Sequence, residues 1–182
     1  TNGSSNPSFS PFVNGRMYEN FSSVGRDLGT WSRSMRDYLS QMERVSRPDI
    51  TIVNVTTGNT GLNADYRNVR FGITSTLLGN GYFAFDFGDK NHGQLWTYDE
   101  YRAFLGEPKG QPRNASGAHT SMNPDVWERD FAKGKVVVNA TEQARQVRLN
   151  GEYEKLRGTQ DTSINNGAFV STVTLEAKDG II

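Results

Sequence analysis

The sequence predicts an α/β region followed by an all-β region. In the first half, three strand-like segments alternate with two helix-like segments, and the strands start about 30 to 35 residues apart, as in successive βαβ units. In the second half, apolar segments become short and turn signals recur about every 8 to 12 residues, which is typical of antiparallel sheets. We therefore expect three parallel βα units and then a small antiparallel β-sandwich.

The first strand and helix are predicted from a short extended segment and a helical repeat. Residues 15–19 are the extended segment, and Thr30 can cap the helix. Apolar residues then fall at helical spacing: Trp31, Met35, Tyr38, Leu39, Met42 and Val45. Arg47–Pro48 ends this helix, because the residue before a proline disfavours the helical conformation. Segment 50–55 is β-branched and almost continuously apolar, as in a strand covered on both faces.

A second helix and a third strand complete the alternation. The apolar positions of the helix are Tyr66, Val69, Ile73 and Leu77. Gly79-Asn80-Gly81 ends it, since glycine suits a left-handed cap. The aromatic segment 82–87 is the third strand. Parallel pairing with right-handed crossovers follows from this order of elements.

The second half contains the signals of about six antiparallel strands. Segments 126–131 and 135–139 are joined by a Lys133-Gly134 hairpin turn, and Asn150-Gly151 is the preferred pair for a type I′ turn. Alternate residues of a later strand are expected to point one way: Phe169, Ser171, Val173 and Leu175. Asp179-Gly180 is expected to turn the chain into a final Ile181-Ile182.

Four segments follow from these patterns. Residues 1–13 are small and polar and resemble a linker, 14–108 hold the parallel units, 109–124 form a second linker, and 125–182 form the antiparallel domain. The chain has no initiator Met and no signal-peptide pattern. We interpret it as a processed product or a piece of a longer protein, and its compartment stays open, with an extracytoplasmic location as one alternative.

Charge and composition exclude several classes of function. The 20 basic and 20 acidic residues cancel, so neither nucleic acid nor an anionic membrane surface is an expected partner. No apolar run approaches the roughly 20 residues of a membrane span. There is no cysteine, and His92 and His119 are the only histidines, so we expect no structural metal and no cofactor. Plentiful acids, amides and aromatic residues weakly favour carbohydrate as a partner.

Three polar residues lie at or near the carboxyl ends of the expected parallel strands, where sites gather in such sheets. They are Glu19, Asn54 and Asp86. Glu19 and Asp86 would stand two strands apart, about 10 Å at the backbone, and their side chains could converge as a pair of catalytic carboxylates. The alternative is that Asp86 caps the next turn and that Glu19 is a solvated loop acid.

The loop after the third strand concentrates aromatic and polar side chains. His92, Trp96 and Tyr98 could stack on a sugar or hydrogen-bond its hydroxyl groups. The alternative is that Trp96 and Tyr101 seal the interface between the two halves of the chain. Both interpretations remain open at this point.

Several motifs resemble the C-terminal part of a family of uncharacterised glycoside hydrolases. They are RFGITSTLLGNGYFAFDFGDKNHGQLWTYDEY, LGEP, VWERDFAKGKVVVNAT and VTLEAKDGII, with NGRMYENF and PDITIVNV resembling the strands before them. The resemblance covers the chain from about Asn14. It implies that the three strands are the last three of a TIM-type barrel and that a β domain follows. The earlier strands, and one catalytic carboxylate, would then lie upstream.

On this resemblance the parent protein hydrolyses glycosidic bonds, Glu19 is the best nucleophile or acid/base, and Asp86 is a second acid or a substrate contact. We expect the chain alone to be inactive, because three strands cannot close an eight-stranded barrel. It would pair with copies of itself or with the missing N-terminal half. The alternative is a non-catalytic carbohydrate-binding or structural module.

Overall fold

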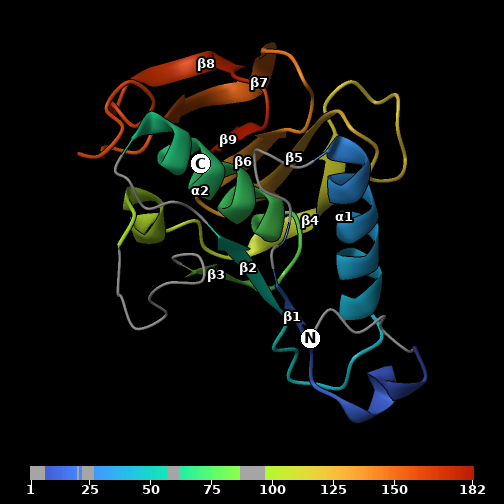
Figure 1. The fold of residues 1–182 in the computed structure, drawn as a ribbon. Coiled ribbons are helices and arrows are strands. Elements are labelled where there is room, and N and C mark those ends of the chain that lie inside the picture. The colour runs from blue at the N-terminus through green and yellow to red at the C-terminus, as the bar shows by residue number, and fades with distance from the viewer. Residues whose placement is uncertain (1–6, 20, 22–26, 57–61, 87–96) are drawn as a thin grey trace.

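The computed structural model describes residues 7–19, 21, 27–56, 62–86 and 97–182, and Figure 1 shows their arrangement. The elements of the first half are η1 (Pro7–Phe12), β1 (Met17–Tyr18), α1 (Leu28–Met42), β2 (Ile52–Thr56), α2 (Asn63–Leu77), β3 (Tyr82–Asp86) and η2 (Asp99–Arg102). Those of the second half are β4 (Pro108–Asn114), β5 (Val126–Phe131), β6 (Gly134–Asn139), β7 (Arg145–Glu154), β8 (Phe169–Leu175) and β9 (Asp179–Ile181). The prediction of a mixed α/β chain with parallel and antiparallel sheets is confirmed in this form.

The parallel sheet has the strand order β1-β2-β3. Tyr18 pairs with Val53, and Val53 pairs with Phe83, so these residues lie level across the sheet. This side of the sheet faces the helices: a Cβ added to Gly72 of α2 would lie 2.6 Å from the Val55 side chain and 3.0 Å from Phe83, and Tyr18 packs against Tyr38 of α1. The two helices therefore cover one face of the sheet.

Helix α1 begins earlier than the sequence predicted. Asp27, not Thr30, is the N-cap: its carboxylate accepts hydrogen bonds from the Thr30 amide at 2.8 Å and from the Thr30 hydroxyl at 2.6 Å. Both residue types are good caps, and Asp27 takes the role because it directly precedes the first helical residue, Leu28. The predicted apolar face is correct, since Trp31, Met35 and Tyr38 are fully buried.

The glycines after α2 are required by packing and not by a left-handed cap. The residue that ends the helix, Leu78, is right-handed, and neither Gly79 nor Gly81 has a positive φ. A Cβ on either glycine would lie 2.6 Å from the Tyr38 hydroxyl oxygen. That hydroxyl donates to the Thr76 carbonyl at 2.9 Å and accepts from the Gly81 amide at 2.7 Å. The glycines thus mark the helix end, as the sequence predicted, but they are needed for close packing against Tyr38 and not for a left-handed cap.

The second half holds a four-stranded sheet of order β4-β5-β6-β9 and a two-stranded ribbon of β7 and β8. Both are antiparallel, as expected. Most of β4 lies inside segment 109–124, which was expected to be a linker. This Pro- and Gly-rich stretch forms a strand because it pairs with β5 as an edge strand, a position that tolerates proline. The division of the chain into domains stays a prediction.

Two predicted turns lie inside strands. Strand β7 runs through Asn150-Gly151, and its register with β8 shifts between Arg148 and Tyr153, so the pair forms a bulge. Asp179-Gly180 belongs to β9, and the preceding turn contains Lys178 at a φ of 52°. Strand β8 continues its ladder with β7 on both sides of Asn150-Gly151, whereas Asp179 and Gly180 pair with Asn139 and Val138 at the end of β6.

One core is shared by the two halves of the chain. Trp31 and Phe71 from the helices pack in the same cluster as Trp127, Val136 and Val138 from β5 and β6. Helix α2 contacts β2 and β3 on one side and β6 and β9 on the other, so it lies between the two sheets (Figure 1). A second cluster joins the four-stranded sheet to the ribbon: Val126, Val137, Val147, Leu149, Val173, Leu175 and Ile181. Phe169, expected on this apolar face, is exposed, and its neighbour Val170 packs against the cluster instead.

Candidate functional site

The three predicted strand-end residues lie on one sheet, toward its carboxyl end. Glu19 directly follows β1, Asn54 lies in β2 level with Ala84, and Asp86 is the last residue of β3, paired with Thr56. The backbone thus places the three positions on adjacent strands, as the sequence predicted. Their catalytic and binding roles stay predictions.

Glu19 is held between two anchored aromatic residues. Tyr18 packs edge-on against Tyr38, with ring centroids 5.9 Å apart, and its hydroxyl donates to Asp37 at 3.0 Å. Burial and the nearby Asp37 charge raise the pKa of Tyr18 well above its usual value, so this hydroxyl stays a donor. Phe21 is buried, and its amide donates to the Asn54 carbonyl at 2.9 Å. Glu19 itself is exposed beside β2.

Asn54 is a buried polar residue in a strand of valines. Its side chain is 6% exposed, and its neighbours Val53 and Val55 are fully buried on the helix side of the sheet. By alternation Asn54 belongs to the opposite side. The side chain of Asp86 and the whole of His92 and Trp96 lie outside the described residues.

Tyr98 has no exposed ring face on which a sugar could stack. It is 1% exposed and packs edge-on against Phe85 at 5.3 Å, Tyr101 at 5.8 Å and Tyr66 at 6.3 Å between centroids. Tyr101 in turn contacts Phe83 at 6.0 Å. These rings cover β3 on its helix side, so Tyr98 supports the strand that carries Asp86 and does not present a binding surface.

Asp99 and Glu100, to which the sequence analysis gave no role, anchor the start of the chain that follows the β3 loop. The Asp99 carboxylate accepts from the amides of Thr159 at 2.7 Å and Gln160 at 2.9 Å. The Glu100 carboxylate accepts from the Asn165 amide group at 2.8 Å. Burial raises the pKa of Glu100 in spite of this bond. Their partners lie some 60 residues further along the chain, so no local pattern could have revealed them.

The sheet face opposite the helices is uncovered along part of its length. We call Met17, Ile52, Tyr82 and Ala84 the open face. Met17, Ile52 and Tyr82 lie level across the three strands, and Met17 is 47% and Tyr82 60% exposed. Parallel sheets in proteins are normally covered on both faces. The open face therefore leaves the apolar side chains of Met17 and Tyr82 exposed to solvent.

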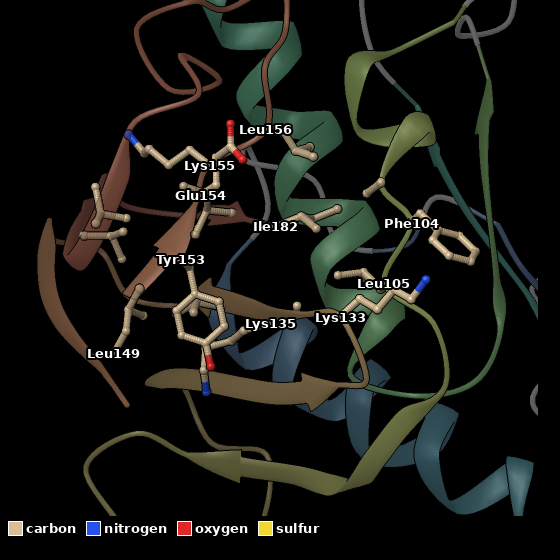
Figure 2. A pocket seen from close by; sticks show the side chains of 16 residues that line it. Phe104, Leu105, Lys133, Lys135, Leu149, Tyr153, Glu154, Lys155, Leu156 and Ile182 are labelled. Atoms are coloured by element: carbon tan, nitrogen blue, oxygen red, sulfur yellow. The ribbon is translucent and has the colours of Figure 1, made fainter. Parts of the chain in front are cut away.

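The described residues contain no group of three or more acidic or histidine side chains placed to hold a metal ion. In the same part of the chain, no helix has the length and apolar character needed to cross a bilayer. A groove of about 270 Å³ lies in the antiparallel half, away from the parallel strands (Figure 2).

The chain belongs to hypothetical glycosyl hydrolase family 15, whose model matches residues 1–135. The match includes the whole parallel sheet, both long helices and the hairpin of β5 with the start of β6. The prediction of a glycoside hydrolase-like family is confirmed at this level. Comparison with curated proteins and with solved structures gives no match.

Proposed function

We propose that this chain is the C-terminal part of a TIM-barrel glycoside hydrolase and carries a share of its active site. The observation that supports this most is the placement of Glu19, Asn54 and Asp86 on consecutive parallel strands, toward the carboxyl end of the sheet. That end carries the active site in (β/α) barrels. Membership of a hypothetical glycosyl hydrolase family agrees with it.

The spacing of the strands suits a pair of carboxylates. Neighbouring strands lie about 4.8 Å apart, and Asp86 lies two residues further along the sheet than the level of Glu19, so the two positions are separated by about 12 Å at the backbone. Side chains that lean toward each other close this distance to the gap used by glycosidases. In the proposed reaction one carboxyl protonates the leaving glycosidic oxygen, while the other attacks the anomeric carbon or removes a proton from the attacking water. No cofactor is needed for these steps.

The other predicted residues would contact the sugar. Asn54 stands on the strand between the two acids, where its amide could bind a hydroxyl group. His92 and Trp96 belong to the loop after β3 and are proposed as substrate contacts on the strength of their residue types. Tyr98 keeps the role of a buried support for β3.

The open face is the second support for a barrel. In a (β/α) barrel the helices cover the outer face of the strands and the inner face packs against the other strands' side chains. Helices α1 and α2 cover one face here, whereas Met17 and Tyr82 on the other face are exposed. Further strands of the same protein would cover the open face and pair with the outer edges of β1 and β3. The antiparallel strands would then be the β-sandwich domain that follows the barrel.

Activity measurements with and without upstream sequence test this proposal. The chain expressed with the coding sequence that precedes Thr1 should hydrolyse members of a panel of aryl glycosides. Glu19→Gln and Asp86→Asn should each lower kcat by about 10² to 10⁴. Glu43→Gln, an exposed acid after α1, is the matched control and should leave kcat unchanged.

The isolated 182-residue chain should show no turnover on the same panel. Robust turnover by this chain would contradict the barrel fragment. Full activity in Glu19→Gln would contradict the catalytic pair. Oligosaccharide binding without turnover, lost in Trp96→Ala, would instead support a non-catalytic carbohydrate-binding module.

A further inference from the structure

The groove in the antiparallel half has an aliphatic floor. It opens between the start of β6, strands β7 and β8, and the chain at 103–105, and its lining side chains are drawn in Figure 2. Val137, Leu149, Val173 and Ile181 are buried beneath it. At about 270 Å³ it lies just below the usual size of a site for a small organic molecule. A short apolar group can pack against this floor and be removed from water.

The ionised groups around the groove leave an excess of positive charge. Buried Lys135 pairs with Glu128 at 3.0 Å and Asp130 at 2.6 Å, and Arg113 pairs with the same two acids, so the charges of these four groups cancel. Glu154, the acid of the lining, pairs with Arg157 at 3.0 Å, and Arg157 does not line the groove.

Two lysines of the lining are left without an acidic partner. No described carboxylate lies within ion-pair distance of Lys133 or Lys155. The Lys133 ammonium lies 4.3 Å from the centre of the exposed Phe104 ring at the groove's edge (Figure 2). In Figure 2 the Lys133 ammonium lies beside Phe104 and the Lys155 ammonium lies on the opposite side of the lining, so positive charge flanks the aliphatic floor on two sides.

We propose that this groove binds an amphiphilic carboxylate: a medium-length acyl chain lies on the aliphatic floor, and its carboxylate is held by one of the two flanking lysines. Burial of the chain supplies most of the affinity, since each methylene removed from water favours binding. The lysines select the anion over a neutral molecule of the same shape. This site is separate from the strand ends and does not depend on the proposed glycosidase activity.

Calorimetric titration of the 182-residue chain with octanoate tests the proposal. We expect saturable binding at one site, with octanol at least tenfold weaker. Hexanoate should bind about 15-fold more weakly, from about 0.8 kcal/mol for each of two methylenes. The double variant Lys133→Met/Lys155→Met should lose at least tenfold in octanoate affinity. Lys109→Met, an exposed lysine of β4 that does not line the groove, is the control and should bind normally.

A second variant tests the floor independently of the lysines. Val170→Trp places a large ring in the groove and should abolish octanoate binding while the circular dichroism spectrum stays unchanged. The proposal is overturned by equal affinity for octanol and octanoate, by an equal loss in Lys109→Met, or by the absence of saturable binding. Binding of a neutral oligosaccharide in place of octanoate, blocked by Val170→Trp, would overturn the choice of ligand.

Discussion

Arg70 of α2 and Asp179 of β9 form a buried, two-pronged ion pair. The Arg70 Nε donates to Asp179 Oδ1 at 2.9 Å, and Nη2 donates to Oδ2 at 3.0 Å. The third prong, Nη1, donates to Asp161 at 2.7 Å. Burial raises the pKa of Asp179. Burial opposes ionisation of Asp161 as well, but hydrogen bonds from Ser163 and Arg70 outweigh it and lower that pKa. One guanidinium thus fastens the parallel half to two segments of the antiparallel half.

Replacing Arg70 should therefore destabilise the whole chain. Arg70→Met leaves two carboxyl groups buried without their cation, which costs about 3–5 kcal/mol. Urea denaturation followed by tryptophan fluorescence measures this loss. Adding Asp179→Asn to Arg70→Met should recover part of it, because one uncompensated charge is removed. A loss below about 1 kcal/mol in Arg70→Met would show that the pair does not join the two halves.

Asn139 is a second polar group on which the antiparallel half depends. Its amide nitrogen donates to the carbonyls of Gln143 at 2.8 Å, Glu176 at 2.8 Å and Leu175 at 3.1 Å, and its oxygen accepts from the Thr141 hydroxyl at 2.8 Å. Asn139→Asp replaces the donor by a second acceptor facing three carbonyls, and should cost at least about 2 kcal/mol at pH 7.

Thermal unfolding monitored by circular dichroism measures the effect of Asn139→Asp. Asn150→Asp, at the bulge in β7, is the control and should change stability by less than about 0.5 kcal/mol, since Asn150 is exposed. An equal effect of the two substitutions would contradict the role of Asn139.

The stability of the chain should depend on pH through Glu100. Burial raises its pKa in the folded state, so the folded chain retains a proton that the unfolded chain releases above about pH 4.3. The contribution of Glu100 to stability is thus greatest at low pH and declines as pH rises through the raised pKa. Glu100→Gln keeps an acceptor for Asn165 and has no proton to lose.

The free energy of unfolding of Glu100→Gln, relative to that of the unmodified chain, should increase from pH 4 to pH 7. Urea denaturation at a series of pH values measures it. Taking the difference between proteins removes contributions common to both, including that of Asp179. Glu107→Gln, at an exposed acid, is the matched control for the substitution. A difference for Glu100→Gln that shrinks as pH rises would reverse the assigned sign.

The open face should drive association of the isolated chain. Leaving apolar surface in water costs about 25 cal/mol per Å², so we expect Met17, Ile52 and Tyr82 to be covered in an interface of more than about 1,000 Å². Light scattering should show self-association, weakened in Tyr82→Glu. Phe169→Glu, at an exposed position on β8, is the control. A monodisperse monomer at high concentration, with no other chain detected by mass spectrometry, would contradict this.

Local sequence patterns predicted most of the helices and strands correctly. They gave wrong turns where contacts with residues far along the chain determine the local structure. The helical repeat of Trp31, Met35 and Tyr38 identified the buried face of α1, because burial along a helix follows its own period. The pair Asn150-Gly151 has the strongest local signal for a turn, yet β8 pairs along β7 on both sides of it. The turn propensity of two residues is smaller than the pairing energy of the strands that flank them.

The chain's own periodicity sufficed for the parallel order of β1, β2 and β3 and for the placement of Glu19, Asn54 and Asp86 toward one end of the sheet. Both properties follow from the alternation of strands and helices, and this alternation can be predicted from short segments of the sequence. The burial of Tyr98, the anchoring of Glu100 and the ion pair of Arg70 were decided by the tertiary structure alone. Each depends on groups brought together from distant positions, such as Arg70 and Asp179, which are 109 residues apart. Contacts of that kind form only when the two halves pack on a common core, and no short-range pattern encodes them.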